Sequence, residues 1–350
     1  MPVSDAGSAP ESTPHAPRLW NVRDTLVRVS DTVLELADVR AASEVIRRRL
    51  HRTPTFHSAT LGERAGAEVW LKAELFQKTG SFKPRGVLNK LSQLSREEKQ
   101  RGVISISAGN HAQALAYAAA QEGIDALVVM WRTASPLKVE AARGYGATID
   151  TEAPDIPAAF ERLDELIQST GRTLVHPYDD PAVMAGQGTV GLELLEDLPE
   201  PDVVLVPVGG GGLVSGVATA VKGRKPATRV VAVEPQRSRA LHESLKAAEP
   251  VMVEAASIAD GLNGPYAGAN CVRQCLALGV ESVLVSEEDL QEAFRFLYAR
   301  AKLAVELAGA ATTAAILAGK AGIQPGQRVV AVVSGGNVAT ETAVAILAGR

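Results

Sequence analysis

The stretch Leu71–Lys90, LKAELFQKTGSFKPRGVLNK, is the one around which the rest of the chain is organised. A run typical of a β-strand, Val69–Ala73, leads into it, and a helix-compatible segment begins near Phe82 after a Thr-Gly break. We therefore expect Lys83 in the first turn of a helix, where burial and the helix dipole both lower the pKa of an amine. Such an amine suits Schiff-base chemistry with an aldehyde. For this stretch alone, an ordinary solvated lysine is the alternative.

Length, charge and cysteine content limit the classes of protein that need to be considered. The 350 residues suit two domains or one large one. A net charge of -4 supplies no basic surface for nucleic acid, and no apolar run is long enough for a membrane span. The two cysteines, Cys271 and Cys275, are too few for a zinc site or a disulfide framework, so we predict packing residues in a reducing, cytoplasmic compartment. Met1–Pro17 has the composition of a loose tail rather than a targeting signal.

The order of the predicted elements indicates an α/β fold. Strands and helices alternate from Val69 onward, and several strands are unbroken Val, Ile and Leu runs, as expected for parallel strands buried on both faces. Strands are predicted at Val69–Ala73, Val103–Ser107, Ala126–Trp131, Ala147–Thr151, Leu174–His176, Val203–Val208, Arg229–Val233, Ser282–Val285 and Arg328–Val333. Helices are predicted at Leu36–Leu50, Asn110–Gly123, Pro136–Tyr145, Asp155–Ser169, Pro181–Asp197, Gly212–Lys222, Glu287–Lys302, Ala308–Gly319 and Asn337–Leu347.

A first candidate ligand site lies where a buried strand meets a helix at residues 107–111, Ser-Ala-Gly-Asn-His. Gly109 permits a sharp turn, so the free N–H groups of the helix N-terminus face an anion, with Asn110 and His111 as side-chain donors. Ser107 and Ala108 complete this loop, which suits a substrate carboxylate. For the stretch alone, an N-capping turn by Ser107 or Asn110 is the alternative.

The second candidate is Gly209-Gly210-Gly211-Gly212, followed by Leu213, again between a strand and a helix. Four residues without side chains let backbone N–H groups surround a phosphate, with the helix dipole behind them. The stretch matches neither the dinucleotide-binding glycine pattern nor a P-loop.

The third candidate is Ser334, at the carboxyl end of the last predicted strand, where ligands of open α/β sheets collect. Its neutral hydroxyl can hydrogen-bond a ring nitrogen without charging it. An N-cap by Asn337 is a further interpretation of this turn.

One ligand satisfies all four stretches, namely an aromatic aldehyde phosphate, and that ligand is pyridoxal 5'-phosphate. Lys83 would take the aldehyde, Gly209–Gly212 the phosphate, Ser334 the ring nitrogen and Asn110 the ring hydroxyl.

With these motifs, in this order and spacing, the sequence resembles the fold-type II pyridoxal-phosphate enzymes, and within them the threonine/serine dehydratases and serine racemases. The resemblance runs from about residue 36 to the end of the sequence. The matching residues are Thr53-Pro54, Ser81–Gly86, Ser107–Gln113, His176-Pro177, Gly186–Thr189, Gly209–Leu213, Val233–Pro235, Asp260-Gly261 and Ser334–Asn337.

The resemblance implies two open, mainly parallel twisted sheets flanked by helices. Residues 34–99 and 178–350 would form a large cofactor domain, residues 100–177 a small mobile domain, and residues 1–33 an N-terminal tail. Phe82 would back the cofactor ring, Leu213 would join the phosphate loop, and Gly261 and Glu306 would lie near the edge of the ring. Enzymes of this kind are homodimers or homotetramers.

The implied reaction is β-elimination of L-threonine or L-serine to a 2-oxo acid and ammonia, with Lys83 as the base at Cα. The alternatives are a serine racemase and a dehydratase of another β-hydroxy amino acid, such as 3-hydroxyaspartate. Racemases of the family carry a serine where this chain has Ala108, and a methyl group cannot move protons. The pair Ser107-Ala108 speaks against a β-replacing synthase, and an intact Lys83 speaks against a catalytically silent ligand-binding protein.

A divalent cation is the remaining open point of the resemblance. Some relatives bind one through a glutamate, a carbonyl and an aspartate. Glu234 is retained as a candidate ligand, but the expected aspartate position holds Ala240. Since the given sequence ends at Arg350, shortly after the helix that follows Ser334, we expect no C-terminal regulatory domain.

Overall fold

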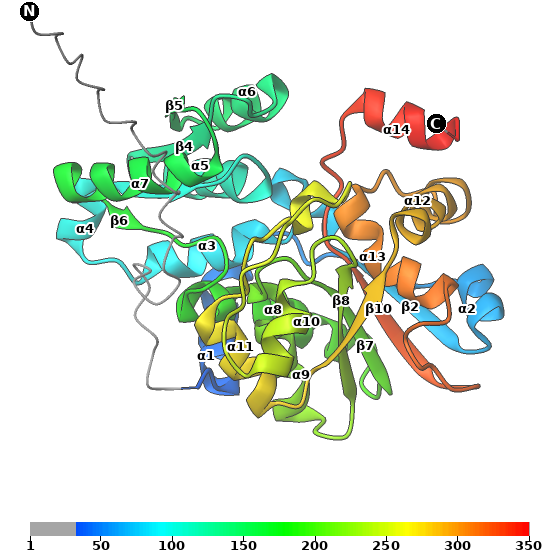
Figure 1. Ribbon diagram of the computed structural model, residues 1–350. Helices are drawn as coiled ribbons and strands as arrows, with labels where there is room; N and C mark the ends of the chain where they lie inside the picture. The colour runs from blue at the N-terminus through cyan, green and yellow to red at the C-terminus, as the bar shows by residue number, and fades with distance from the viewer. Residues whose placement is uncertain (1–32, 350) are drawn as a thin grey trace, which may run out of the picture.

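The structure, a computed structural model, describes residues 33–349 and contains two β-sheets flanked by helices (Figure 1). The tail predicted for residues 1–33 lies outside the described residues, apart from Val33. The larger sheet has the strand order β1-β2-β10-β7-β8-β9 and the smaller one β5-β4-β3-β6. Among the described strands only the β1–β2 pairing is antiparallel. The predicted α/β fold with mainly parallel sheets is therefore confirmed.

The strands are β1 (Thr55–His57), β2 (Glu68–Ala73), β3 (Val103–Ile106), β4 (Ala126–Trp131), β5 (Thr148–Ala153), β6 (Thr173–Leu174), β7 (Val203–Pro207), β8 (Arg229–Pro235), β9 (Glu281–Val285) and β10 (Arg328–Val333). The α-helices are α1 (Leu36–Ile46), α2 (Ala59–Ala65), α3 (Lys83–Ser92), α4 (Arg96–Arg101), α5 (Asn110–Glu122), α6 (Pro136–Gly144), α7 (Ile156–Thr170), α8 (Pro181–Asp197), α9 (Gly212–Arg224), α10 (Ala240–Ala247), α11 (Ala269–Ala277), α12 (Glu287–Phe296), α13 (Leu307–Leu317) and α14 (Thr340–Leu347). Short 3₁₀ turns occur at η2 (Glu74–Phe76), η3 (Lys78–Gly80) and η4 (Asp260–Leu262), and a π-helical turn at η5 (Leu297–Ala301).

The smaller sheet draws all of its strands from residues 103–174, and we call this part, with α5, α6 and α7, the small-sheet lobe. The rest of the described chain, built on the six-stranded sheet, is the large-sheet lobe. In Figure 1 the small-sheet lobe lies at the upper left and the strands β2, β7, β8 and β10 lie at the lower right. The domain boundaries expected at residues 100 and 177 stay a prediction.

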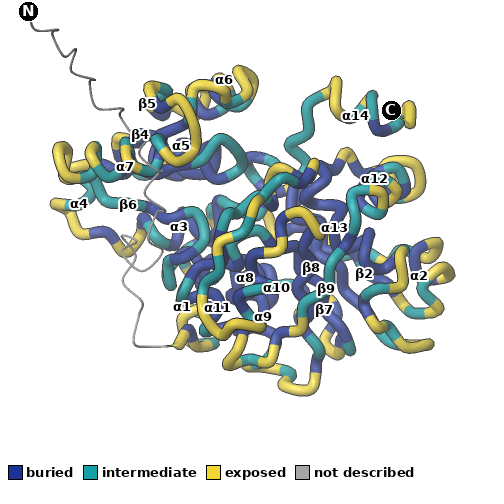
Figure 2. The backbone as a smooth tube through the Cα atoms, in the orientation of Figure 1, coloured by how far each residue is buried: buried dark blue, intermediate teal, exposed yellow. Residues whose placement is uncertain are grey.

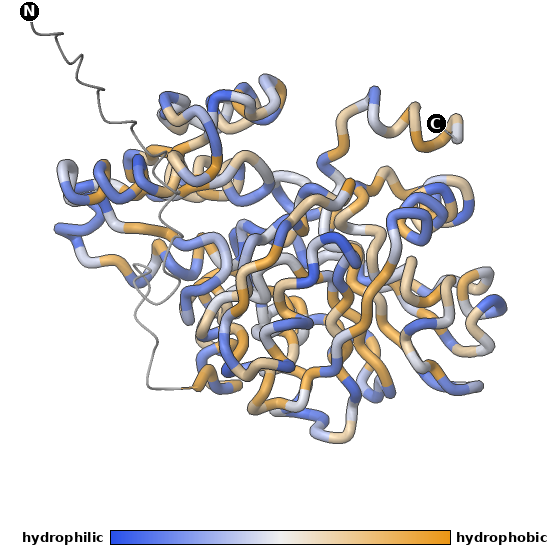
Figure 3. The backbone as a smooth tube through the Cα atoms, viewed as in Figure 1, coloured by the Kyte–Doolittle hydropathy of each residue, from blue (hydrophilic) through white to orange (hydrophobic). Residues whose placement is uncertain are grey.

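Both faces of the central strands are covered by helices, as the unbroken apolar runs predicted. In β7, Val203 and Leu205 pack on one side with residues of α12 and α13, whereas Val204 and Val206 pack on the other with residues of α8 and α9. These strands are buried in Figure 2 and hydrophobic in Figure 3, while polar residues lie on the outer helices. None of the helices within residues 33–349 combines the length and apolar character needed to cross a membrane.

Three predicted helices are clearly shorter than their sequence patterns indicated. Helix α1 ends at Ile46 rather than at Leu50. The segment predicted as Glu287–Lys302 is α-helical only to Phe296 and then widens into η5, after which Lys302 adopts a left-handed conformation with φ 60°. The last helix begins at Thr340 rather than Asn337, and Ala339 is its N-cap residue. The interpretation of Asn337 as an N-cap is therefore wrong.

A buried cluster of four charged side chains fixes the position of helix α3. Arg85, two residues after Lys83, is fully buried and donates from Nε and Nη2 to Glu74 at 2.8 and 2.9 Å. Its Nη1 and Nη2 donate to Glu193 of α8 at 2.7 and 2.9 Å, and Lys72 donates to the same carboxylate at 2.7 Å. Burial alone would lower the pKa of Arg85, but the two carboxylates raise it above its usual value.

The two cations and two anions balance, so the cluster places β2, η2, α3 and α8 relative to one another without an unpaired buried charge. The same helices approach closely at Gly186, where a Cβ atom would lie 2.4 Å from the carbonyl oxygen of Arg85. Helix α3 is thus held on α8 by charge and by close backbone contact.

We predict that Arg85→Met destabilises the protein by about 3–5 kcal/mol, because it leaves the buried Glu74 carboxylate without a cation, whereas Glu193 keeps its pair with Lys72. Denaturant unfolding followed by circular dichroism measures the change. The matched control is Arg143→Met, which removes an exposed i,i+3 pair with Glu140 and is expected to cost less than about 0.5 kcal/mol. Equal unfolding midpoints for the two variants would contradict the role given to the cluster.

Candidate active site

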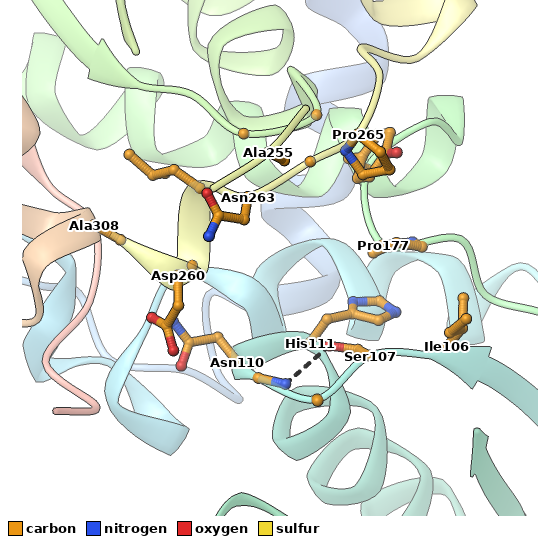
Figure 4. Close-up of a pocket in the computed structure, with 18 of the residues that line it drawn as sticks. Ile106, Ser107, Asn110, His111, Pro177, Ala255, Asp260, Asn263, Pro265 and Ala308 are labelled. Carbon is orange, nitrogen blue, oxygen red and sulfur yellow. Dashed lines mark hydrogen bonds between the residues drawn. The ribbon is translucent and has the colours of Figure 1, made fainter. Parts of the chain in front are cut away.

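The predicted site residues come together around one cavity of about 870 Å³ between the two lobes. Figure 4 shows part of this cavity, with the loop after β3 at the bottom and the segment around Asn263 and Pro265 at the top. The volume falls within the range of small-molecule sites, roughly 300–1,000 Å³. The predicted cofactor and substrate residues that line it are Phe82, Lys83, Ser107, Ala108, Gly109, Asn110, His111, Gly209, Gly210, Gly211, Gly212, Leu213, Gly261, Glu306 and Ser334.

Lys83 is the first residue of α3, as the sequence predicted, and its side chain is partly buried in the wall of the cavity. Its Nζ donates to the carbonyl oxygen of Pro177 at 2.8 Å and lies 5.2 Å from the centre of the Phe82 ring. Burial lowers the pKa of Lys83 to about 8, although the nearby Glu306 carboxylate acts in the opposite direction. An appreciable fraction of this amine is therefore neutral at neutral pH, as a nucleophile or general base requires.

Backbone hydrogen bonds attach the start of α3 to the end of β10. The N–H of Phe82 donates to the carbonyl oxygen of Ser334 at 3.2 Å, and the N–H of Gly336 donates to that of Gly80 at 2.9 Å. Ser81 and Gly335 form an isolated antiparallel bridge between these bonds. Two stretches that lie about 250 residues apart in the sequence are thereby fixed side by side, and both Lys83 and Ser334 face the cavity.

The four-glycine loop joins β7 to α9, and Gly211 has a left-handed φ of 100°. A side chain at Gly210 is also excluded sterically, because a Cβ atom there would lie 2.4 Å from the ring of Tyr178. A Cβ atom on Gly212 would lie 2.8 Å from the carbonyl oxygen of Tyr178. The loop therefore packs its backbone directly on Tyr178 and leaves the N-terminus of the 13-residue helix α9 at the cavity, an arrangement suited to a phosphate.

The loop after β3 has no side-chain N-cap. Gly109 is the N-cap residue of α5, and its N–H donates to Ser107 Oγ at 3.2 Å, the dashed line in Figure 4. Ser107 therefore satisfies a backbone donor of the turn, as the N-capping alternative expected, but neither Ser107 nor Asn110 caps the helix. The N-terminus of α5 opens into the cavity, as expected for a carboxylate site.

The side chain of Asn110 bridges the two lobes. Its Nδ2 donates to Glu306 Oε1 at 2.7 Å, and its Oδ1 accepts from Asn337 Nδ2 at 2.8 Å. Asn337 also donates to the carbonyl oxygen of Thr79 at 2.7 Å, which gives that side chain a role that its sequence position did not reveal. Burial raises the pKa of Glu306 to about 7.

His111 differs from its expected role as a side-chain donor to an anion. The ring is buried, and its Nε2 lies 3.0 Å from the carbonyl oxygen of Val175, so Nε2 carries the proton and donates to that carbonyl. Burial and the nearby Lys83 lower the pKa of His111 to about 3, which keeps the ring neutral. The loop is thus left with backbone N–H groups and Asn110 as its donors.

An aromatic cluster below the four-glycine loop carried little signal in the sequence. The rings of His176 and Tyr178 lie 4.6 Å apart edge to face, and those of Tyr178 and Tyr266 lie 5.8 Å apart. Nδ1 of His176 accepts the N–H of Asp179 at 2.8 Å, which fixes the turn that presents the Pro177 carbonyl to Lys83. His176 and Pro177 belong to a motif that the sequence revealed. The packing of Tyr178 on Gly210 could not be predicted from the sequence and is seen only in the structure.

Glu234 lies at the end of β8 and outside the cavity. Its carboxylate accepts the N–H groups of Leu241 at 2.8 Å and His242 at 2.7 Å, so it binds the N-terminal turn of α10, where Ala240 stands in place of a second acid. Within residues 33–349 no three His, Cys, Asp or Glu side chains gather in a metal-binding group. The residues around Glu234 do not fit a divalent cation.

The cavity fits the ligand that the sequence predicted. It combines a buried amine of lowered pKa, a glycine loop in which Gly210 has no room for a side chain, and a hydroxyl at the end of β10. An aldehyde, a phosphate and a ring nitrogen would each find a matching group on this surface.

Comparison with known proteins agrees with this geometry. The family model described as pyridoxal-phosphate dependent enzyme matches residues 46–335. The chain is 43% identical over 310 residues, 87% of this chain and 90% of the relative, to the catabolic L-threonine dehydratase TdcB of Staphylococcus aureus. It superposes with a TM-score of 0.82 on a crystal structure of the T.th. threonine deaminase, at 41% identity and covering 87% and 99% of the two chains. The TM-score is 0.83 for serine racemase from Dictyostelium discoideum, at 35% identity and covering 88% and 100%.

We predict that Gly210→Ala weakens retention of pyridoxal phosphate by about tenfold, because the added methyl group would force the loop away from Tyr178. The measurement is the cofactor content, by visible absorption, after dialysis against a series of cofactor concentrations. Gly144→Ala in helix α6 is the control, since a Cβ atom there meets nothing within 4 Å. Equal retention by both variants would show that the close contact at Gly210 does not shape the phosphate site.

Proposed function

This chain belongs to the pyridoxal-phosphate-dependent enzyme family, and we propose that it converts L-threonine and L-serine to 2-oxobutanoate or pyruvate and ammonia. The observation that carries the proposal is the desolvated Lys83 amine, which shares one cavity with the four-glycine loop and the Ser107–His111 loop. Similarity to dehydratases of known name along most of the chain supports it. The enzyme is then a lyase that acts on small amino acids.

Bound pyridoxal phosphate supplies an electron sink for the negative charge that develops at Cα of the substrate. Lys83 would hold this cofactor through Nζ, and its free amine would remove the Cα proton as general base. A base works best with a pKa near the working pH, and burial brings the pKa of Lys83 to about 8. The Pro177 carbonyl 2.8 Å away gives the amine a fixed position from which to act.

The remaining parts of the cavity would orient the substrate and the cofactor. The N-terminus of α5, with the backbone N–H groups of residues 107–111, would bind the substrate carboxylate. Gly209–Gly212 and Leu213 would hold the cofactor phosphate at the N-terminus of α9. Phe82, Gly261 and Glu306 would surround its ring.

Ser334 favours elimination over racemisation. A serine hydroxyl is not an acid, so it can hydrogen-bond the ring nitrogen but does not protonate it. Charge at Cα is then less delocalised, which favours loss of the β-hydroxyl over return of a proton to Cα. Ala108 acts in the same direction, because its methyl group offers no proton on the loop that would hold the substrate.

The proposed function is tested by 2-oxo acid release from L-threonine, L-serine and 3-hydroxyaspartate, combined with chiral analysis of the remaining amino acid. We expect turnover of threonine and serine with little racemisation. Lys83→Ala should reduce turnover to the background rate while its circular dichroism spectrum is unchanged. Full turnover by this variant would remove Lys83 from its role, and D-serine as the main product would replace the dehydratase with a racemase.

We predict that Ala108→Ser raises the racemase side activity by about tenfold or more, because it supplies a hydroxyl that can move a proton on the substrate-binding loop. The readout is the ratio of D-serine to pyruvate formed from L-serine, compared with that of the wild-type enzyme. An unchanged ratio would count against the explanation based on the missing acid/base group.

A further inference from the structure

One ion pair crosses the mouth of the cavity from one lobe to the other. Lys138 of α6, in the small-sheet lobe, donates to the carboxylate of Asp260, the first residue of η4 in the large-sheet lobe. Both residues line the cavity, and their side chains are 33% and 62% exposed. In Figure 4 Asp260 lies at the same end of the cavity as Asn110. The pair therefore lies at a solvent-exposed edge of the cavity, on the side of the substrate loop.

The charges around the cavity are few and mostly negative. Within the described chain, the Lys and Arg residues that line it are Lys83 and Lys138, and the acidic residues are Glu254, Asp260 and Glu306. The Lys83 amine is committed to the cofactor and to the Cα proton. Lys138 is then the remaining cation that could meet a second carboxylate on a substrate, and Asp260 already neutralises it.

Both partners act on the interior of the cavity and not only on each other. The Glu306 carboxyl, which is hydrogen-bonded to Asn110 of the substrate loop, has its pKa raised mainly by burial. The charge of Asp260 raises that pKa further and the charge of Lys138 lowers it. The field of the pair thus reaches the groups that surround the substrate.

The Lys138–Asp260 ion pair is better explained by a role in substrate selectivity than by a role in stabilising the fold. An ion pair this exposed contributes little to stability, because water screens it and two flexible side chains must be held in place.

We propose that the Lys138–Asp260 pair makes the site selective for β-hydroxy amino acids with neutral side chains, by cancelling the ammonium that would otherwise accept a β-carboxylate. The inference rests on the proposed function and deepens it by naming the substrate class. With the pair intact, a substrate such as 3-hydroxyaspartate would bring its second carboxylate toward Asp260 without a free cation to offset the repulsion. Threonine and serine carry no such charge.

The test compares kcat/KM for L-threo-3-hydroxyaspartate with kcat/KM for L-threonine in four forms of the holoenzyme. Asp260→Asn keeps the shape of the side chain and frees Lys138, and it should raise the ratio about fivefold, the effect of one exposed charge pair. The double variant Asp260→Asn/Lys138→Met should lose that gain. The control is Glu200→Gln, which breaks a remote pair of similar exposure with Lys225 and should leave the ratio unchanged.

Binding of succinate, a dicarboxylate that cannot react, provides a readout independent of turnover. Calorimetric titration of the holoenzyme should show tighter binding to Asp260→Asn than to the wild type, and no such gain in the double variant. An unchanged ratio and unchanged succinate affinity in Asp260→Asn would overturn the inference, as would an equal gain in the double variant. If the wild type forms no 2-oxo acid from threonine or serine, the proposed function fails separately, and the succinate series still tests the ion pair.

Discussion

Partial burial of the Lys83 amine is the constraint on which the site depends. A solvated lysine would be almost fully charged at neutral pH, whereas this one has a pKa of about 8 because it is buried. The amine needs a fixed surrounding to remain buried, and the Pro177 carbonyl and the Phe82 ring provide it. Helix α3 supplies the position, since the buried charges around Arg85 and the backbone bonds to the end of β10 hold its first turn in place.

Two arrangements of charge serve different purposes in this molecule. The cluster of Lys72, Glu74, Arg85 and Glu193 is largely buried and balanced, so each group is expensive to remove and the elements it joins are fixed. Lys138 and Asp260 lie at the edge of the cavity in contact with water, where a pair contributes little to folding but changes the potential that a substrate meets. The buried charges thus determine the position of helix α3. In our proposal, the charges at the edge of the cavity determine which substrates are selected.

The parts of the fold that the sequence revealed are those with strong local patterns. Strands such as β7 and β10 are unbroken runs of buried Val and Leu, and four glycines directly after the buried strand β7 are typical of a phosphate-binding loop. Strand β1 was missed because it has only three residues, none of them buried, and helix α4 because it buries no side chain. Helices α2, α10 and α11, of seven, eight and nine residues, were also missed.

Contacts between distant segments could not be predicted without the fold. Tyr178 explains why Gly210 must be glycine, and Lys138 meets Asp260 across 122 residues, yet no local pattern marks either relation. An N-cap was one interpretation of Asn337, whereas its side-chain amide donates to Asn110 and to the carbonyl oxygen of Thr79. The homodimer or homotetramer and the cytoplasmic location stay predictions.

The most direct measurement locates the lysine that carries the cofactor. Borohydride reduction of the holoenzyme fixes the cofactor permanently to the amine that holds it, and proteolysis with mass spectrometry then identifies the modified peptide. Our account predicts one pyridoxyl phosphate group per chain, on Lys83. Modification of a different lysine, or a chain that retains no cofactor after reduction, would contradict it.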